Sequence, residues 1–405
     1  MTSRSFLLGL TILALLSLLL RSPLLFLLAS LLALVAGASA VWERYCLSGV
    51  SYARQIGARR LFCGEGTDLW VEIVNAKPLP LAWLKAQDEW PDAVAVSKTR
   101  LTPAGEPHRR LLTNLFNLRW YERVRRHYRL AASRRGVFDF GPVAVSSGDI
   151  FGFRTRRMEV DHRHTLLVYP KIVPLEKLDL RPARPLGDYG AQRRLTADPL
   201  QLAGARDYRP GEGVRHIHWK ATARRGALQT KQFDPSASHQ LILCLNCQTL
   251  ERHYGGILVD ELETAIVAAA SITHAAFELR HPVGFVSNGS LRGAEGLARL
   301  PASRHADHEL RLLEMLAQLT YFTVTQFDQL LRAEAARLPF GATLIVITAL
   351  VTDSILAELL NLRRAGHPVA LIVVGLPPPP AGPESLIPTH YLATNWTDLE
   401  TLTLD

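Results

Sequence analysis

The first forty residues of the chain are almost entirely apolar. Two uncharged runs, SFLLGLTILALLSLLL and LLFLLASLLALVAGASAV, are separated only by Arg21-Ser22-Pro23. A single membrane span would bury both an arginine and a helix-breaking proline at the centre of the bilayer, which is costly. The pattern therefore predicts a hairpin of two short transmembrane helices over residues 1–42, with Trp42 at the membrane surface.

Basic residues flank this apolar region and predict its orientation. One arginine precedes the first run and several follow the second: Arg4, then Arg44, Arg54, Arg59 and Arg60. The positive-inside rule places both ends in the cytoplasm, which predicts a multi-pass protein of the inner or cell membrane with cytoplasmic soluble domains. The alternative is a signal peptide cleaved after Ala38-Ser39-Ala40. The apolar stretch is too long for that and is broken in its middle, so the hairpin is favoured.

Short segments of alternating apolar and polar residues follow between residues 52 and 170. Examples are the segments 68–74, 126–130 and 136–140, each bounded by turn-forming residues. Alternation with a period of two is typical of strands with one buried face. We therefore expect a small antiparallel β-sandwich over residues 52–170.

The pattern changes twice more. Residues 171–235 are rich in arginine, proline and glycine, and we interpret them as a basic linker. Over residues 236–405, continuous apolar runs such as 343–347 and 368–374 alternate with segments of helical periodicity. Apolar strands that alternate with helices predict a parallel sheet covered on both faces, hence a doubly wound α/β domain.

Composition narrows the class of protein only a little. A chain of 405 residues is long enough for two soluble domains and an anchor, and its net charge of +9 permits nucleic acid, anionic lipid or an acidic protein as partner. Nucleic acid is disfavoured because no zinc-finger, RRM or KH pattern is present. The four cysteines are too few for a disulfide framework, so we expect structural thiols: Cys46, Cys63, Cys244 and Cys247.

The most distinctive stretch of the chain is RDYRPGEGVRHIHWKATARRGALQTK, from Arg206 to Lys231. Its candidate binding or structural residues are Arg206, Asp207, Tyr208, Arg209, Arg215, His218, Trp219, Lys220 and Arg224.

Three interpretations of this stretch are open. It could form a buried hydrogen-bonded knot that includes the Trp219 indole, or a surface for an acidic partner, phosphate or anionic lipid. It could also be catalytic, with His218 as general base. No nucleophile, carboxylate pair or phosphate-binding glycine loop accompanies that histidine in the sequence.

This stretch and the segment RRGVFDFGPVAVSSGDIFGF, from Arg134 to Phe153, resemble the prokaryotic domain-of-unknown-function 58 family. The resemblance implies two N-terminal membrane spans, a strand-rich region and a C-terminal domain similar to von Willebrand factor A. Genes of the family often lie beside those of MoxR-type AAA+ ATPases, which implies such an ATPase as the protein partner.

Von Willebrand factor A domains often bind a divalent ion through an Asp-x-Ser-x-Ser motif and a later aspartate. The corresponding positions here are Asn246, Gln248 and Ala349. Mg²⁺ prefers hard, charged oxygen ligands, which these residues do not supply, so we expect neither a metal nor another cofactor.

Together these observations predict a membrane-anchored scaffold or adaptor without enzymatic activity. It would assist an AAA+ ATPase in the assembly or maturation of envelope or secreted proteins. The alternative is an enzyme that acts on an anionic substrate at the Arg209–Arg225 cluster.

Overall fold

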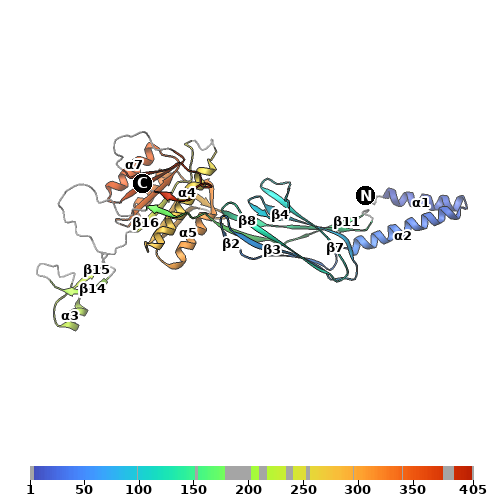
Figure 1. Cartoon of the computed structure of the whole chain (residues 1–405), viewed down its shortest axis with the longest axis horizontal. Helices are drawn as coiled ribbons and strands as arrows, with labels where there is room; N and C mark the ends of the chain where they lie inside the picture. Colours follow the sequence, from blue (N-terminus) through green and yellow to red (C-terminus); the bar gives the residue numbers. More distant parts are fainter. Residues whose placement is uncertain are drawn as a thin grey trace. The chain divides into compact units, whose positions relative to one another are not determined.

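The chain divides at Pro170 into two units, Met1–Pro170 and Lys171–Asp405 (Figure 1). The structure is a computed structural model. It describes residues 4–97, 99–150, 154–177, 202–208, 217–233, 240–251, 256–294, 296–339, 341–376 and 387–403.

Two helices packed side by side begin the first unit, α1 (Arg4–Leu19) and α2 (Pro23–Tyr45) (Figure 1). By length and apolar composition α2 can span a membrane, since its 23 residues extend about 35 Å. In the described part of the chain no other helix meets this measure, because α1 has only 16 residues. The prediction of an apolar N-terminal helix is confirmed, whereas a second membrane span is not supported by helix length.

Strands β1–β12 form three sheets in the rest of the first unit. Their bounds are β1 (Val50–Ile56), β2 (Arg60–Phe62), β3 (Gly66–Asn75), β4 (Leu81–Pro91), β5 (Val94–Val96), β6 (Thr102–Pro103), β7 (Arg109–Leu118), β8 (Arg123–Ala132), β9 (Gly136–Phe140), β10 (Val143–Gly148), β11 (Thr155–Val160) and β12 (His164–Tyr169). Two sheets are antiparallel, with orders β1-β3-β8-β5 and β11-β10-β4-β7-β6. In the third, β12 pairs with β2 in parallel and with β9 antiparallel.

Alternating burial along the strands explains how the sheets pack. In β3, Leu69, Val71 and Ile73 are fully buried, while the residues between them reach the surface. Since successive side chains of a strand point to opposite faces, one face of this sheet covers the core. Trp90 and Phe140 fill that core with their ring centroids 4.6 Å apart. The antiparallel sheets predicted for residues 52–170 are therefore present.

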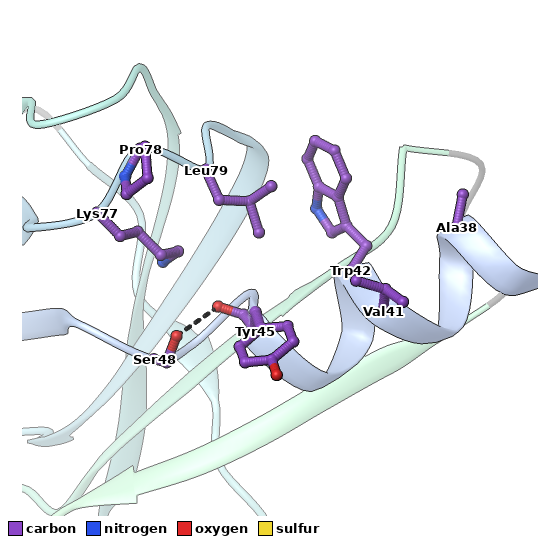
Figure 2. A pocket seen from close by; sticks show the side chains of 8 residues that line it. All are labelled: Ala38, Val41, Trp42, Tyr45, Ser48, Lys77, Pro78 and Leu79. Carbon is purple, nitrogen blue, oxygen red and sulfur yellow. Dashed lines mark hydrogen bonds between the residues drawn. The ribbon is translucent and has the colours of Figure 1, made fainter.

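Polar contacts fasten the C-terminal end of α2 to these sheets. Ser39 Oγ donates to Asp149 Oδ2 at 2.5 Å, and Arg154 Nη1 pairs with Glu43 Oε2 at 2.9 Å. A groove of about 580 Å³ lies beside the same end of the helix (Figure 2). Its lining comes from α2, the turn after it and the loop between β3 and β4: Ala38, Val41, Trp42, Tyr45, Ser48, Lys77, Pro78 and Leu79.

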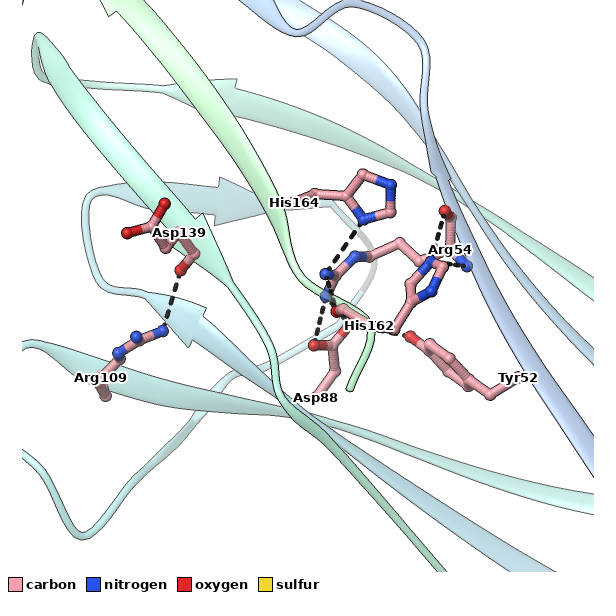
Figure 3. Close-up of polar contacts among 7 residues, drawn as sticks. All are labelled: Tyr52, Arg54, Asp88, Arg109, Asp139, His162 and His164. Carbon is pink, nitrogen blue, oxygen red and sulfur yellow. Dashed lines mark hydrogen bonds and ion pairs between the residues drawn. The ribbon is translucent and has the colours of Figure 1, made fainter. Parts of the chain in front are cut away.

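A buried ion pair joins the two antiparallel sheets inside the first unit (Figure 3). Arg54 of β1 contacts Asp88 of β4 at 2.5 Å, and the two side chains are 0% and 2% exposed. Tyr52 Oη donates to the same carboxylate at 2.9 Å, and Arg54 Nη2 donates to the His162 carbonyl at 2.7 Å. Buried charges need such partners, because an uncompensated charge in a protein core is strongly destabilising.

The second unit contains a mostly parallel sheet with helices. The strands are β16 (Leu241–Leu245), β17 (Val283–Leu291), β18 (Leu297–Ser303), β19 (Leu319–Thr323), β20 (Thr343–Thr348), β21 (Val369–Val374) and β22 (Thr389–Leu392). The helices are α4 (Val259–Glu278), α5 (Ala306–Gln318), α6 (Phe327–Ala335) and α7 (Asp353–Arg364). The order is β18-β17-β16-β20-β21-β22, in which β18 is antiparallel to β17, and β19 also pairs with β17.

Helices cover both faces of this sheet. Leu344 and Val346 of β20 belong to a core cluster with residues of α6 and α7. Ile345 and Ile347 are also buried and, by strand alternation, point to the opposite face, where α4 contacts β16, β20 and β21. The doubly wound α/β arrangement is thus present, while its assignment to the von Willebrand factor A type remains a prediction.

The first residues of the expected linker are packed against the second unit. Lys171 Nζ donates to the Leu399 carbonyl at 2.8 Å, and the Val173 N–H donates to Ser271 Oγ of α4 at 3.0 Å. The strand β13 (Leu175–Lys177) then pairs in parallel with β23 (Leu402–Thr403). Further along the linker lie β14 (Leu202–Asp207), α3 (Trp219–Arg225) and β15 (Gln229–Phe233).

Substitution of Asp88 by Asn should destabilise the first unit, because it leaves the Arg54 guanidinium buried without a counter-charge. We expect the opening free energy of β4, measured by hydrogen exchange on the full chain, to fall by about 3 to 5 kcal/mol. Asp161→Asn is the matched control, since its pair with Arg163 is 80% and 71% exposed and should contribute little. Equal effects of the two substitutions would contradict this account.

Acidification should also weaken the first unit through His164. Burial, together with the nearby Arg54 charge, lowers the pKa of His164 from its ordinary value of 6.5 to about 4. Between these values the unfolded chain binds more protons than the folded one, so stability falls as the pH drops from 6.5 through 4. His164→Gln should flatten this dependence in hydrogen exchange of β12. His108→Gln, at a side chain 87% exposed, should leave it unchanged.

Candidate functional site

The strand order of the second unit marks one position where a ligand could bind. The chain starts the sheet at its centre with β16, winds outward through β17 and β18, and then crosses to β20 on the other side. In doubly wound sheets the loops diverge at this switch point, outside the carboxyl ends of the two central strands. Here those ends are Leu245 and Thr348, so the residues that follow them are candidates for a site.

Neutral side chains bonded to one another fill this position. Asn246 Nδ2 donates to Thr348 Oγ1 at 2.9 Å, and Asn246 Oδ1 accepts from Asn288 Nδ2 at 2.9 Å. Asn288 Oδ1 accepts in turn from the Cys247 N–H at 2.8 Å. All four residues are buried. The donors and acceptors at the edge of the sheet therefore satisfy each other within the core.

The three positions expected to correspond to metal ligands lie at this edge. Asn246 is the centre of the neutral network, Gln248 donates from Nε2 to the Leu250 carbonyl at 3.0 Å, and Ala349 carries no side-chain oxygen. Over the described ranges of the chain there is no group of three or more His, Cys, Asp or Glu residues arranged to hold a metal ion. The expectation that no metal binds stays a prediction.

The neighbouring thiols are as deeply buried as the network. Cys244 lies inside β16, where burial raises its pKa to about 12. Cys247 is fully buried, with Sγ 3.2 Å from Ser287 Oγ. A thiol must ionise to act as a nucleophile or a metal ligand, so this burial makes Cys244 unreactive at neutral pH.

The distinctive Arg206–Lys231 stretch forms a separate small element, which we call the α3 motif (β14, α3 and β15). The strands β14 and β15 are antiparallel, with Arg206 opposite Thr230 and Asp207 opposite Gln229. The short helix α3 precedes β15, and an isolated bridge between Ile217 and Thr230 ties its entry to the same strand.

Gln229 organises the α3 motif. Gln229 is 1% exposed, and its side chain both donates and accepts a hydrogen bond. Nε2 donates to Asp207 Oδ1 at 2.6 Å, and Oε1 accepts from Arg225 Nη1 at 3.3 Å. Its backbone N–H donates to Thr222 Oγ1 at 3.0 Å. Gln229 and Thr222 are not among the candidate residues predicted from the sequence. Their contacts depend on the register between β14 and β15, which the sequence pattern does not specify.

Both ends of α3 are capped within the motif. His218 occupies the N-cap position, and its Nδ1 accepts from the Ala221 N–H at 3.2 Å. Gly226 ends the helix in the left-handed conformation, φ 67°, which glycine adopts without a steric penalty. The polar groups of this short helix are thus satisfied locally, and one nitrogen of His218 is engaged in the cap.

The side chains of α3 that point away from these contacts are exposed. Trp219 is 64% exposed, so the structure corrects the interpretation in which its indole is buried in a knot. Lys220 and Arg224 are exposed on the same helix, and Arg206 and Tyr208 are partly buried beside it. Arg209 and Arg215, which were expected to join this cluster, lie outside the described residues.

Comparison with known proteins finds one family and one relative that match part of the chain. A family model described as "Protein of unknown function DUF58" matches residues 204–375, which include the α3 motif and most of the α/β unit. The uncharacterized protein YeaD of Bacillus subtilis is 27% identical over 272 residues, which are 66% of this chain and 63% of that protein. The chain thus aligns with less than two thirds of its relative's length.

Two of the solved structures that resemble this chain each match less than a third of it. One is the CARDB domain of the PF1109 protein from Pyrococcus furiosus, which is 8% identical with a TM-score of 0.19. The match covers 29% of this chain and 91% of the CARDB domain chain. The other is a cohesin module from Clostridium perfringens, which is 12% identical with a TM-score of 0.20. That match covers 29% of this chain and 96% of the cohesin chain. Likenesses at this level carry no conclusion about function.

Replacing Asn246 by Ala should weaken the core at the switch point. The change removes one hydrogen bond each from Thr348 Oγ1, Asn288 Nδ2 and the Gln248 N–H. Each of these hydrogen bonds contributes about 0.5 to 1.5 kcal/mol to stability. Hydrogen exchange of β16 and β20 reports the loss. Asn361→Ala, at an exposed position of α7, serves as the control and should have almost no effect. Protection unchanged in both variants would show that the network is dispensable.

Proposed function

We propose that the chain is a membrane-anchored scaffold or adaptor whose α3 motif binds an acidic surface of a protein partner. In this proposal α1 and α2 form a two-span hairpin in the inner or cell membrane, the remainder is cytoplasmic, and the α/β unit is of the von Willebrand factor A type. The partner is a MoxR-type AAA+ ATPase, which the adaptor assists in the assembly or maturation of envelope or secreted proteins.

One observation carries the proposal: Trp219 is 64% exposed beside Lys220 and Arg224 on a helix that is already capped at both ends. Tryptophan and arginine are enriched among the residues that contribute most to the energy of protein interfaces. The internal bonds of Gln229 hold the motif in shape, so the exposed side chains are presented without a large entropic cost on binding.

The geometry favours binding over catalysis at this motif. An enzyme acting on an anionic substrate at the Arg209–Arg225 cluster would need His218 as its base. The His218 Nδ1 instead accepts a backbone hydrogen bond as the helix cap, and this contact gives the residue a structural role. The exposed surface of the α3 motif has the residues of an interface without requiring a reaction.

The test is affinity purification of the tagged full chain from native membranes in mild detergent, with and without ATP, followed by mass spectrometry. We expect an AAA+ ATPase to be recovered with the wild type. Trp219→Ala should weaken its binding about thirtyfold, the effect of an interface hot spot worth about 2 kcal/mol. Arg224→Glu should also weaken binding, because it reverses a charge that faces an acidic partner.

Arg363→Glu is the matched control for the charge reversal. Arg363 in α7 and Arg224 in α3 are both exposed and both stand one residue before the end of their helix, so the local helix effects are alike. If the two variants Arg224→Glu and Arg363→Glu recover equal amounts of the ATPase, the α3 motif is not part of the interface. Turnover of an anionic substrate that is lost in His218→Ala would overturn the adaptor proposal itself.

A further inference from the structure

One face of α2 carries a continuous apolar stripe that no described residue of the first unit covers. Its residues follow each other at spacings of four and three: Leu27, Leu31, Leu34, Ala38, Val41 and Tyr45. All six are exposed. The better-buried positions Leu25, Ala29, Leu32 and Ala36 lie on the side that packs with α1. At about 100° per residue, the stripe is centred about 170° away from that side.

The stripe leads directly into the groove at the end of the helix. Ala38, Val41 and Tyr45 are its last residues, and all three line the groove, which the loop of Lys77, Pro78 and Leu79 closes on the other side (Figure 2). The exposed apolar surface of α2 and the groove are therefore one continuous surface.

The groove holds a buried hydrogen-bond donor without an acceptor. The Trp42 indole nitrogen, Nε1, is buried and has no hydrogen-bond partner among the described residues, although Trp42 lines the groove (Figure 2). A buried N–H that lacks a partner costs free energy, so a bound group that supplies an acceptor oxygen would be stabilised there. The chemistry at this point calls for an apolar molecule with an oxygen acceptor at one end.

The turn between β7 and β8 lies beside the same loop. The Tyr121 N–H donates to the Lys77 carbonyl at 3.2 Å, and Asn75 Nδ2, just before the loop, donates to the Arg119 carbonyl at 2.8 Å. This turn exposes two adjacent aromatic side chains, Trp120 at 66% and Tyr121 at 69%. Aromatic residues of this kind are enriched where proteins meet the surface of a bilayer.

Two cations accompany these aromatic residues. Arg44 stands in the last turn of α2 and Arg119 begins the β7–β8 turn, and both are exposed. Neither guanidinium has a partner in the described parts of the chain. Cations at the membrane surface attract anionic headgroups.

We propose that this region binds an anionic phospholipid, an inference that rests on the proposed anchoring through α2. The acyl chain lies along the stripe and enters the groove, where the Trp42 N–H donates to an ester carbonyl. Arg44 and Arg119 attract the phosphate, and Trp120 and Tyr121 contact the surface of the bilayer. The β-rich part of the first unit thus rests on the membrane as well as being attached to it through α2.

A second membrane helix is the competing occupant of the stripe, and the residues of α2 disfavour it. Helices associate in membranes through small residues that allow close approach. In α2 the small residues Ala29 and Ala36 lie on the α1 side, whereas the stripe presents Leu27, Leu31 and Leu34. Large aliphatic side chains without a partner are suited to contact with lipid chains.

The first test measures quenching of tryptophan fluorescence in the full chain, reconstituted into nanodiscs that contain phospholipid brominated on the acyl chain near the headgroup. We expect Trp42→Phe and Trp120→Phe each to remove a quenched component. Trp396→Phe should remove none, since its indole belongs to the second unit and donates to Asp260 at 3.3 Å. Quenching that is unchanged in Trp42→Phe and Trp120→Phe would overturn the inference.

The second test measures how strongly phosphatidylglycerol is enriched over phosphatidylcholine among the lipids that remain with the detergent-purified protein. Arg119→Ala should lower this enrichment about fivefold, the effect of one cation at an anionic surface. Arg110→Ala is the matched control, because Arg110 is also exposed but lies at the opposite end of β7. An equal enrichment of phosphatidylglycerol in both variants would show that Arg119 does not bind the headgroup.

Two further outcomes separate this inference from the proposed anchoring. Release of the wild type from membranes by alkaline carbonate would contradict the proposed anchoring. Retention in the membrane without Trp42-dependent quenching would contradict only the proposed lipid site. Disulfide cross-linking between two chains that carry Leu31→Cys, with no cross-link for Ala29→Cys, would assign the stripe to a second copy instead and overturn the lipid as its occupant.

Discussion

The need to pair every polar group that leaves water is the constraint on which the rest of this structure depends. An unpaired amide or charge in the core costs more than a single paired contact contributes, and the main buried polar pairs here join strands that lie far apart in sequence. Arg54 meets Asp88 between two sheets of the first unit, and Asn246 meets Thr348 between the central strands of the second. In the α3 motif, Gln229 plays the same part.

This pairing also decides where the chain has surface left for binding. At the switch point of the α/β sheet, neutral amides and hydroxyls bond to each other, so the edge where such folds often hold a ligand is filled from within. The exposed groups suited to binding stand elsewhere, on α3 and at the end of α2. Trp219 and Trp120 are both more than half exposed, and the buried Trp42 N–H has no acceptor among the residues that the structure describes.

A division of labour between the two units follows from these surfaces. The first unit combines an apolar helix with a groove and an aromatic turn that suit a bilayer, and the second carries a basic motif that suits an acidic protein. The proposed scaffold would use both kinds of surface, because it would hold a partner and remain at the membrane. Its internal networks provide rigidity, and its exposed indoles and cations provide the contacts.

The sequence by itself determined the features that depend on local periodicity. The apolar run of α2, the alternation of β3 and the continuous strands around β20 follow from hydrophobic spacing, which neighbouring residues specify without help from the rest of the chain. It also singled out Asp207 and Trp219 as residues of interest. The tertiary structure alone decided that Asp207 bonds to Gln229 and that Trp219 is exposed.

The same limit explains what the sequence did not reveal about the cores. Arg54 and Asp88 are 34 residues apart, and no local pattern records that the two sheets bring them within 2.5 Å. Periodicity specifies which face of an element is apolar, whereas packing between distant elements decides which polar groups meet and which remain exposed.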